Sequence, residues 1–115
     1  MSISVASHNL DRLKQLYTAG FHDAFLDSAL RKVIERQIAR DETDLRRVNE
    51  MLAQFERRYE LTSDEFWRRF QAGEMSDTAD FMEWNVFCKM QQRITSRLRI
   101  LRGDGAGTTR QTTPS

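Results

Sequence analysis

Three carboxylates that could do chemistry recur at helical spacing within the second half of the chain. Asp77, Asp80 and Glu83 are three residues apart, so a helix would place them along one face. Such a face could hold a divalent cation or attract a basic partner. It could also serve only as favourable negative charge at a helix N-terminus. The spacing leaves all three interpretations open.

Residues that usually carry catalysis or bind metals are sparse in this sequence. His8 and His22 have no Cys or His at ligand spacing, which argues against a zinc site. The chain has no phosphate-binding, dinucleotide-binding, nucleophile-elbow or metalloprotease motif. We therefore expect a non-enzymatic protein without metal or cofactor. The single cysteine, Cys88, is expected to be an apolar packing residue in a helix, which fits a reducing compartment.

An aromatic cluster surrounds the three carboxylates in the sequence. Residues 66–87 contain two tryptophans and four phenylalanines, more than a helical hairpin easily buries. Aromatic side chains fill cores, and they also dominate the hot spots of protein interfaces. We therefore expect part of the cluster to bind a partner. The predicted partner-binding residues are Phe66, Trp67, Phe70, Glu74, Asp77, Asp80, Phe81, Glu83 and Trp84.

Charge is distributed unevenly, although the net charge is only +1. Residues 64–83 carry six acidic side chains against two arginines, a local net charge of −4. Residues 89–110 carry six basic side chains against one aspartate, a local net charge of +5. An acidic surface that contains aromatic residues would attract a basic protein partner.

Four helices are expected to position these residues. Apolar residues within 8–18 follow helical spacing up to Gly20, which suits a left-handed helix terminus. Residues 21–60 lack Gly and Pro and form one long helix with a coiled-coil seam, if Asp41 fills one seam position. The apolar seam positions recur every three or four residues: Ile34, Ile38, Leu45, Val48, Leu52, Phe55 and Tyr59. A break or kink would fall in the polar stretch 40–44. Ahead of the first helix, residues 2–6 alternate polar and apolar like a short strand.

The clearest local signal is a capping box formed by Thr62 and Glu65. It predicts a short helix that ends at Gly73. Residues 76–78 then supply N-cap candidates for a last long helix that continues to Arg102. The acid-first i,i+4 pairs expected on the short helix are Asp64 with Arg68 and Glu65 with Arg69.

The expected fold is all-α: a helical hairpin of two long helices, with a short N-terminal helix and a short capped connecting helix. Residues 1–102 would form one helical domain. Residues 103–115 are rich in Gly and Thr, so a disordered tail is expected there. No apolar run approaches the roughly 18 residues of a membrane span, and the N-terminus lacks the features of an export signal. We therefore expect a cytoplasmic protein.

Residues 55–84 carry a pattern that extends beyond these separate elements. The pattern consists of Phe55-Glu56-Arg57-Arg58-Tyr59, Ser63-Asp64-Glu65-Phe66, Phe70, Gly73-Glu74-Met75, Asp77 and Asp80-Phe81-Met82-Glu83-Trp84. It resembles small bacterial antitoxin-like proteins of type II toxin–antitoxin pairs, in which a protein antitoxin wraps and silences its toxin. The family pattern has glycine at the positions of Glu60 and Ser76, so both turns are expected to be built differently. The resemblance implies an antitoxin that neutralises a cognate, basic protein toxin, and it implies no catalytic residue.

Two other functions stay open. A strand at residues 2–6 followed by two helices has the order of a ribbon-helix-helix DNA-binding repressor. No Lys or Arg precedes Arg12, however, so contacts from this strand to DNA would be poor. The long-helix seam could instead form a structural homodimeric coiled coil, which would make the protein a homo-oligomer.

Overall fold

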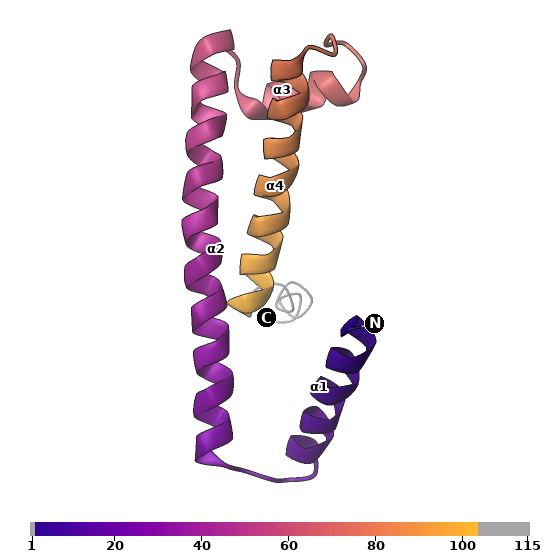
Figure 1. The fold of residues 1–115 in the computed structure, drawn as a ribbon, viewed down its shortest axis with the longest axis vertical. Helices are drawn as coiled ribbons and strands as arrows, with labels where there is room; N and C mark the ends of the chain where they lie inside the picture. The colour runs from indigo at the N-terminus through magenta and orange to yellow at the C-terminus, as the bar shows by residue number, and fades with distance from the viewer. Residues whose placement is uncertain (1, 104–115) are drawn as a thin grey trace, which may run out of the picture. The chain divides into compact units, whose positions relative to one another are not determined.

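The computed structural model describes residues 2–103 and shows an all-α protein (Figure 1). Its helices are α1 (Ser2–Thr18), α2 (Ala24–Tyr59), α3 (Ser63–Gln71) and α4 (Ala79–Leu101). This confirms the predicted hairpin of two long helices with a short capped helix between them. Residues 104–115, most of the predicted disordered tail, lie outside the described residues.

The chain forms two compact units, Met1–Val33 and Ile34–Ser115. The first unit contains α1 and the start of α2, and the second contains the rest of α2 with α3 and α4. The boundary between these two units lies within α2, and the single helical domain predicted for residues 1–102 stays a prediction. Across the described part of the chain, no helix combines the length and the apolar character needed to cross a bilayer.

Residues 2–6 are the first turns of α1, so the strand considered for them is wrong. A strand needs a partner for its backbone groups, and residues 2–103 contain no other strand. The predicted terminus at Gly20 is confirmed, since its φ is 100°. The amide N–H groups of Gly20 and Phe21 donate to the carbonyl oxygens of Tyr17 and Leu16 at 3.0 and 3.2 Å. These bonds form a Schellman motif, in which glycine avoids a Cβ clash.

α2 continues without a break through the polar stretch 40–44. Asp41 occupies the seam position predicted for it and is only 1% exposed. The side-chain amide of Gln37 donates to its carboxylate at 3.0 Å, and the Thr43 hydroxyl donates to the carbonyl of Ala39 at 3.1 Å. The polar groups of this stretch therefore have partners inside a helix, and no kink is needed to satisfy them.

In the second unit, α2 and α4 run antiparallel, and α3 forms the corner between them (Figure 1). Hydrogen bonds of 2.8 Å link the two long helices at three levels, between Arg58 and Asp80, Asn49 and Gln91, and Asp41 and Arg97. Residue numbers fall along α2 as they rise along α4. The two helices also share one apolar core. The three bonds and this core together define a single register of the hairpin.

The turn between α2 and α3 contains Glu60 in a left-handed conformation with φ 52°. The N–H of Leu61 donates to the carbonyl of Glu56 at 3.3 Å, as in a Schellman ending. This is the position where the antitoxin-like pattern has glycine. Ser76, the other such position, has no left-handed φ. Of these two positions, only that of Glu60 therefore requires a conformation that favours glycine.

The capping interaction predicted for α3 is present in part. The N–H of Glu65 donates to the Thr62 hydroxyl at 3.1 Å. The carboxylate of Glu65 pairs with Arg69, as predicted, and also with Arg68. The predicted pair of Asp64 with Arg68 is therefore replaced, because Glu65 lies between both arginines on the helix surface.

The other ends of α3 and α4 follow the predictions. α3 ends in a Schellman motif at Gly73, whose φ is 76° and whose N–H donates to the carbonyl of Phe70 at 3.1 Å. Thr78 caps α4 by accepting from the N–H of Phe81 at 3.2 Å. These local signals fix where each helix of the corner begins and ends.

Candidate protein-binding surface

Trp84 forms the centre of the core rather than part of an exposed face. Its indole lies between the rings of Phe55 from α2 and Phe66 from α3, with ring centroids at 5.5 and 4.0 Å. The indole N–H donates to the Ser63 hydroxyl at 2.9 Å, so its polar atom is satisfied within the core. Trp84 and Phe66 are both 0% exposed. One aromatic stack therefore joins three helices.

This stack corrects the predicted partner-binding set. Phe66 and Trp84 cannot touch a partner while the core is intact, because both side chains are fully buried. The other aromatic residues of the set are half-buried and pack against the core: Trp67, Phe70 and Phe81. The expected surplus of aromatic area was wrong for Phe66 and Trp84, since α3 adds a third layer that a simple hairpin lacks.

The carboxylates of the predicted partner-binding set also fall into two groups, one bonded within the fold and one exposed. Asp80 accepts from the Arg58 guanidinium at 2.8 Å and from the Tyr59 hydroxyl at 2.5 Å. These two bonds, the one from Tyr59 above all, lower the pKa of Asp80. Asp80 therefore fastens α4 to α2. Glu74, Asp77 and Glu83 are exposed, and we call these three the acidic corner.

The described residues offer no cluster for a metal ion. Within residues 2–103, no group of three or more His, Cys, Asp or Glu side chains is arranged to hold one. His8 and His22 are exposed on α1 and on the loop before α2. Cys88 is buried, and burial raises the pKa of its thiol to about 11. This thiol is therefore a packing group, as predicted.

An ion pair closes the far end of the α2–α4 seam. The Asp41 carboxylate accepts from Nε and from a terminal nitrogen of Arg97, both at 2.8 Å. Arg97, with half of its side chain exposed, thereby lowers the pKa of the almost fully buried Asp41. A bidentate arginine is held in one orientation. Arg97 is therefore fixed at the edge of the seam.

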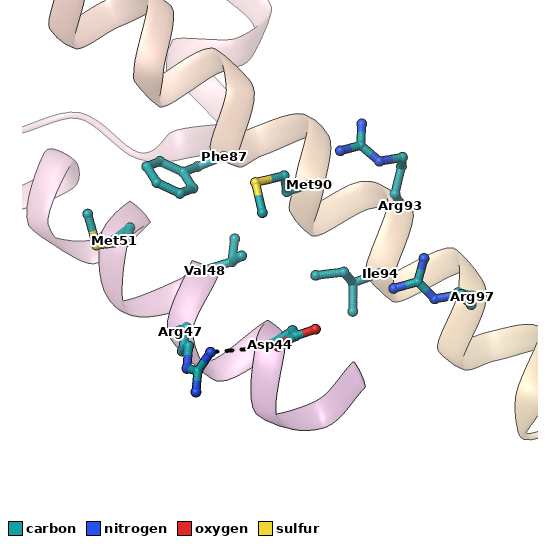
Figure 2. A pocket seen from close by; sticks show the side chains of 9 residues that line it. All are labelled: Asp44, Arg47, Val48, Met51, Phe87, Met90, Arg93, Ile94 and Arg97. Carbon is teal, nitrogen blue, oxygen red and sulfur yellow. Dashed lines mark ion pairs between the residues drawn. The ribbon is translucent and has the colours of Figure 1, made fainter. Parts of the chain in front are cut away.

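Beside this pair, an open groove of about 480 Å³ runs between α2 and α4 (Figure 2). Its apolar residues are Val48, Met51, Phe87, Met90 and Ile94, and its charged residues are Asp44, Arg47, Arg93 and Arg97. Val48 and Ile94 are buried core residues, whereas Met51, Phe87 and Met90 are half-buried. We call this feature the α2–α4 groove. It is apolar along its centre and basic along its borders.

The sequence prediction missed this groove. None of its residues belongs to the predicted partner-binding set, which was drawn from the acidic and aromatic segment 66–84. A signal was present, because Phe87, Met90 and Ile94 recur at helical spacing with Arg93 and Arg97 next to them. The groove exists only where this edge of α4 meets the edge of α2 that carries Met51. The pairing of two distant segments therefore creates it.

Comparison of the chain with protein-family models, with curated proteins and with solved structures gives no match.

Proposed function

We propose that this chain is a non-enzymatic protein-binding module, and that its partner is a toxin of the type II class suggested by residues 55–84. The observation that carries the proposal is the α2–α4 groove, which stays open after the core has been filled. Helical hairpins bind partner segments along such grooves, where apolar side chains give affinity and charged borders give register.

The composition of the groove favours a protein partner. Met51 and Met90 line it from opposite helices, and methionine side chains adapt to varied apolar surfaces. Phe87 adds a rigid aromatic surface of the kind found at interface hot spots. A partner side chain inserted here would contact both helices at once.

The acidic corner supports the more specific toxin assignment. Glu74, Asp77 and Glu83 are exposed, and their carboxylates make no ion pair or hydrogen bond within residues 2–103. Half-buried Trp67 precedes them on α3. Exposed carboxylates without a partner would accelerate association with a basic protein. A toxin that acts on nucleic acid would carry such a basic surface.

The two alternative functions have less support. Residues 2–6 are helical, so the strand that a ribbon-helix-helix protein inserts into DNA is not available. In the seam expected to dimerise, Val48, Leu52 and Phe55 are already buried in the core of the same chain. A homodimeric coiled coil through these residues would require the hairpin to open, which would expose the core.

Co-expression with the product of a neighbouring toxin-like reading frame tests the proposal. The wild-type chain should relieve the growth arrest and bind the toxin in calorimetry. Met90→Glu places a charge in the groove and should weaken the affinity for the toxin by about tenfold or more. Met82→Glu is the matched control, because Met82 is 53% exposed on the same helix and does not line the groove.

Both variants must show wild-type circular dichroism before their affinities are compared. If growth arrest persists with the wild-type chain, the toxin assignment fails. If both variants bind the toxin as tightly as the wild type, the α2–α4 groove is not the binding surface. Loss of binding in Glu83→Gln alone would instead place the interface at the acidic corner.

A further inference from the structure

The α2–α4 groove has the geometry of a seat for a third helix. On α2 its lining positions 44, 47, 48 and 51 recur every three or four residues, and on α4 so do positions 87, 90, 94 and 97. Two antiparallel helices leave a channel along their seam, and in helical bundles a further helix buries its apolar stripe there. α3 does not fill this channel, because α3 packs on Trp84 at the corner.

The borders of the groove carry more basic than acidic side chains. Of its nine lining residues, three are arginines and only Asp44 is acidic. The guanidinium of Arg93 makes no ion pair or hydrogen bond within residues 2–103. Arg47 approaches Asp44 only at 4.0 Å, with three quarters of its side chain exposed (Figure 2). Arg47 on one wall and Arg93 on the other therefore have donors free for an incoming carboxylate.

We propose that the groove binds an acidic amphipathic helix of the partner protein. Apolar side chains at i, i+3 or i+4, and i+7 of that helix would lie between Met51, Phe87 and Met90. Carboxylates on either side of this apolar stripe would pair with Arg47 and Arg93, as flanking charges do in coiled coils. The inference rests on the proposed protein-binding function, and it names the kind of segment that is bound.

Charge also decides against a segment of the same chain as the occupant. Helix α1 carries Arg12 and Lys14 against Asp11 alone, so its net charge has the same sign as the borders of the groove. As a whole, α4 carries four basic side chains against two acidic ones, so a second copy of this helix would bring further positive charge. A separate acidic helix matches the arginines on both walls.

A designed peptide provides the probe. It is a helix of about 18 residues, roughly five turns, with leucines along one stripe and glutamates on both flanks. Its matched control replaces every glutamate by glutamine. With the full chain, fluorescence anisotropy should show that the glutamate peptide binds about tenfold more tightly at low salt, and that added salt removes this difference.

The same titrations with two chain variants locate the charge effect. Arg47→Gln combined with Arg93→Gln should reduce the affinity of the glutamate peptide to that of the glutamine peptide. Lys89→Gln, an exposed change on α4 outside the groove, should change that affinity by less than about twofold. When the glutamate peptide is added, the amide signals that shift in NMR spectra should be those of residues 44–51 and 87–97.

The outcomes separate this inference from the proposed function. Equal affinity for both peptides, or an unchanged affinity in the double arginine variant, would show that the occupant of the groove is not acidic. The proposal that the groove binds a protein would still stand. Absence of binding by either peptide would overturn helix-in-groove recognition, while the toxin measurements with Met90→Glu still test the groove. Self-association of the chain that disappears in the double arginine variant would assign the groove to a second copy and overturn the inference.

Discussion

The guanidinium of Arg97 on α4 donates two hydrogen bonds of 2.8 Å to the carboxylate of Asp41 on α2. Asp41 occupies a seam position at which an apolar residue would otherwise be expected, and it is 1% exposed. A shift of one helix past the other would leave this carboxylate buried without its counter-ion, with only the side-chain amide of Gln37 as a donor. The pair therefore selects one register for the hairpin, as a polar residue does in the seam of a coiled coil.

Removal of one member of this pair should be more harmful than removal of both. Arg97→Met leaves a buried carboxylate unpaired and should lower the free energy of unfolding by about 2–3 kcal/mol. Asp41→Leu combined with Arg97→Met should recover most of that loss, because apolar side chains then fill the seam. Urea unfolding followed by circular dichroism measures both. Equal stability of the single and the double variant would contradict a coupled pair.

The Asp41 carboxylate should also make stability depend on pH. Arg97 lowers the pKa of Asp41 in the folded protein, whereas the pKa of an aspartate in an unfolded chain is about 3.9. The ionised carboxylate therefore stabilises the fold fully above the unfolded value, and this contribution is lost as pH falls through the folded pKa. The difference in unfolding free energy between wild type and Asp41→Asn should be constant from about pH 7 to 5 and shrink below about 4.

Asp44→Asn provides the control for this titration, because Asp44 is exposed on the next turn of α2. It should change the free energy of unfolding by less than about 0.5 kcal/mol at any of these pH values. A wild-type advantage over Asp41→Asn that persists unchanged at pH 2 would exclude the carboxylate as its source.

Glycine should be favourable at position 60 and unfavourable at position 76. Glu60 has a φ of 52°, a conformation in which a side chain is strained by about 1 kcal/mol. Glu60→Gly should therefore stabilise the protein by about 0.5 kcal/mol after the entropy of the unfolded chain is included. Ser76→Gly should destabilise it by a similar amount, since Ser76 has no left-handed φ. Thermal unfolding of both variants checks the contrast, and a gain at position 76 would be the wrong result.

Trp84→Ala should act on stability before it acts on binding. The side chain is 0% exposed, so its removal should cost about 3–5 kcal/mol of unfolding free energy. Ser63→Ala removes only the acceptor of the indole N–H and should cost about 1 kcal/mol. Trp67→Ala, at a half-buried position, should cost less than Trp84→Ala. If the Trp84→Ala variant has wild-type stability, Trp84 is not a core residue, and the prediction that it binds a partner would be open again.

Cys88 should react only when the fold opens. Burial raises the pKa of its thiol to about 11, which leaves little thiolate near neutral pH. Alkylation by iodoacetamide at pH 7.5 should therefore be slower in native protein than in urea, by a factor on the order of one hundred. Mass spectrometry of timed samples measures both rates. Similar rates would show that this part of α4 opens easily.

Local signals in the sequence determined the helices and most of their ends. Thr62 and Thr78 cap α3 and α4, and glycines 20 and 73 end α1 and α3, because a cap depends on residues within one or two turns. The placement of Asp41 in the seam also followed from the 3-4 spacing. The strand at residues 2–6 was wrong, since alternation over five residues does not supply a partner strand.

Only the tertiary structure decided which side chains are available to a partner. Spacing assigns both Trp84 and Trp67 to an apolar side of a helix, and the difference in their burial arises because α3 folds over the ring of Trp84. The α2–α4 groove likewise joins Met51 to Met90, 39 residues later in the sequence. Local spacing assigns a residue to a helix face, but packing between distant segments determines what that face meets. The sequence thus determined the helices of this protein, and their packing decided which of its side chains stay exposed and where the α2–α4 groove lies.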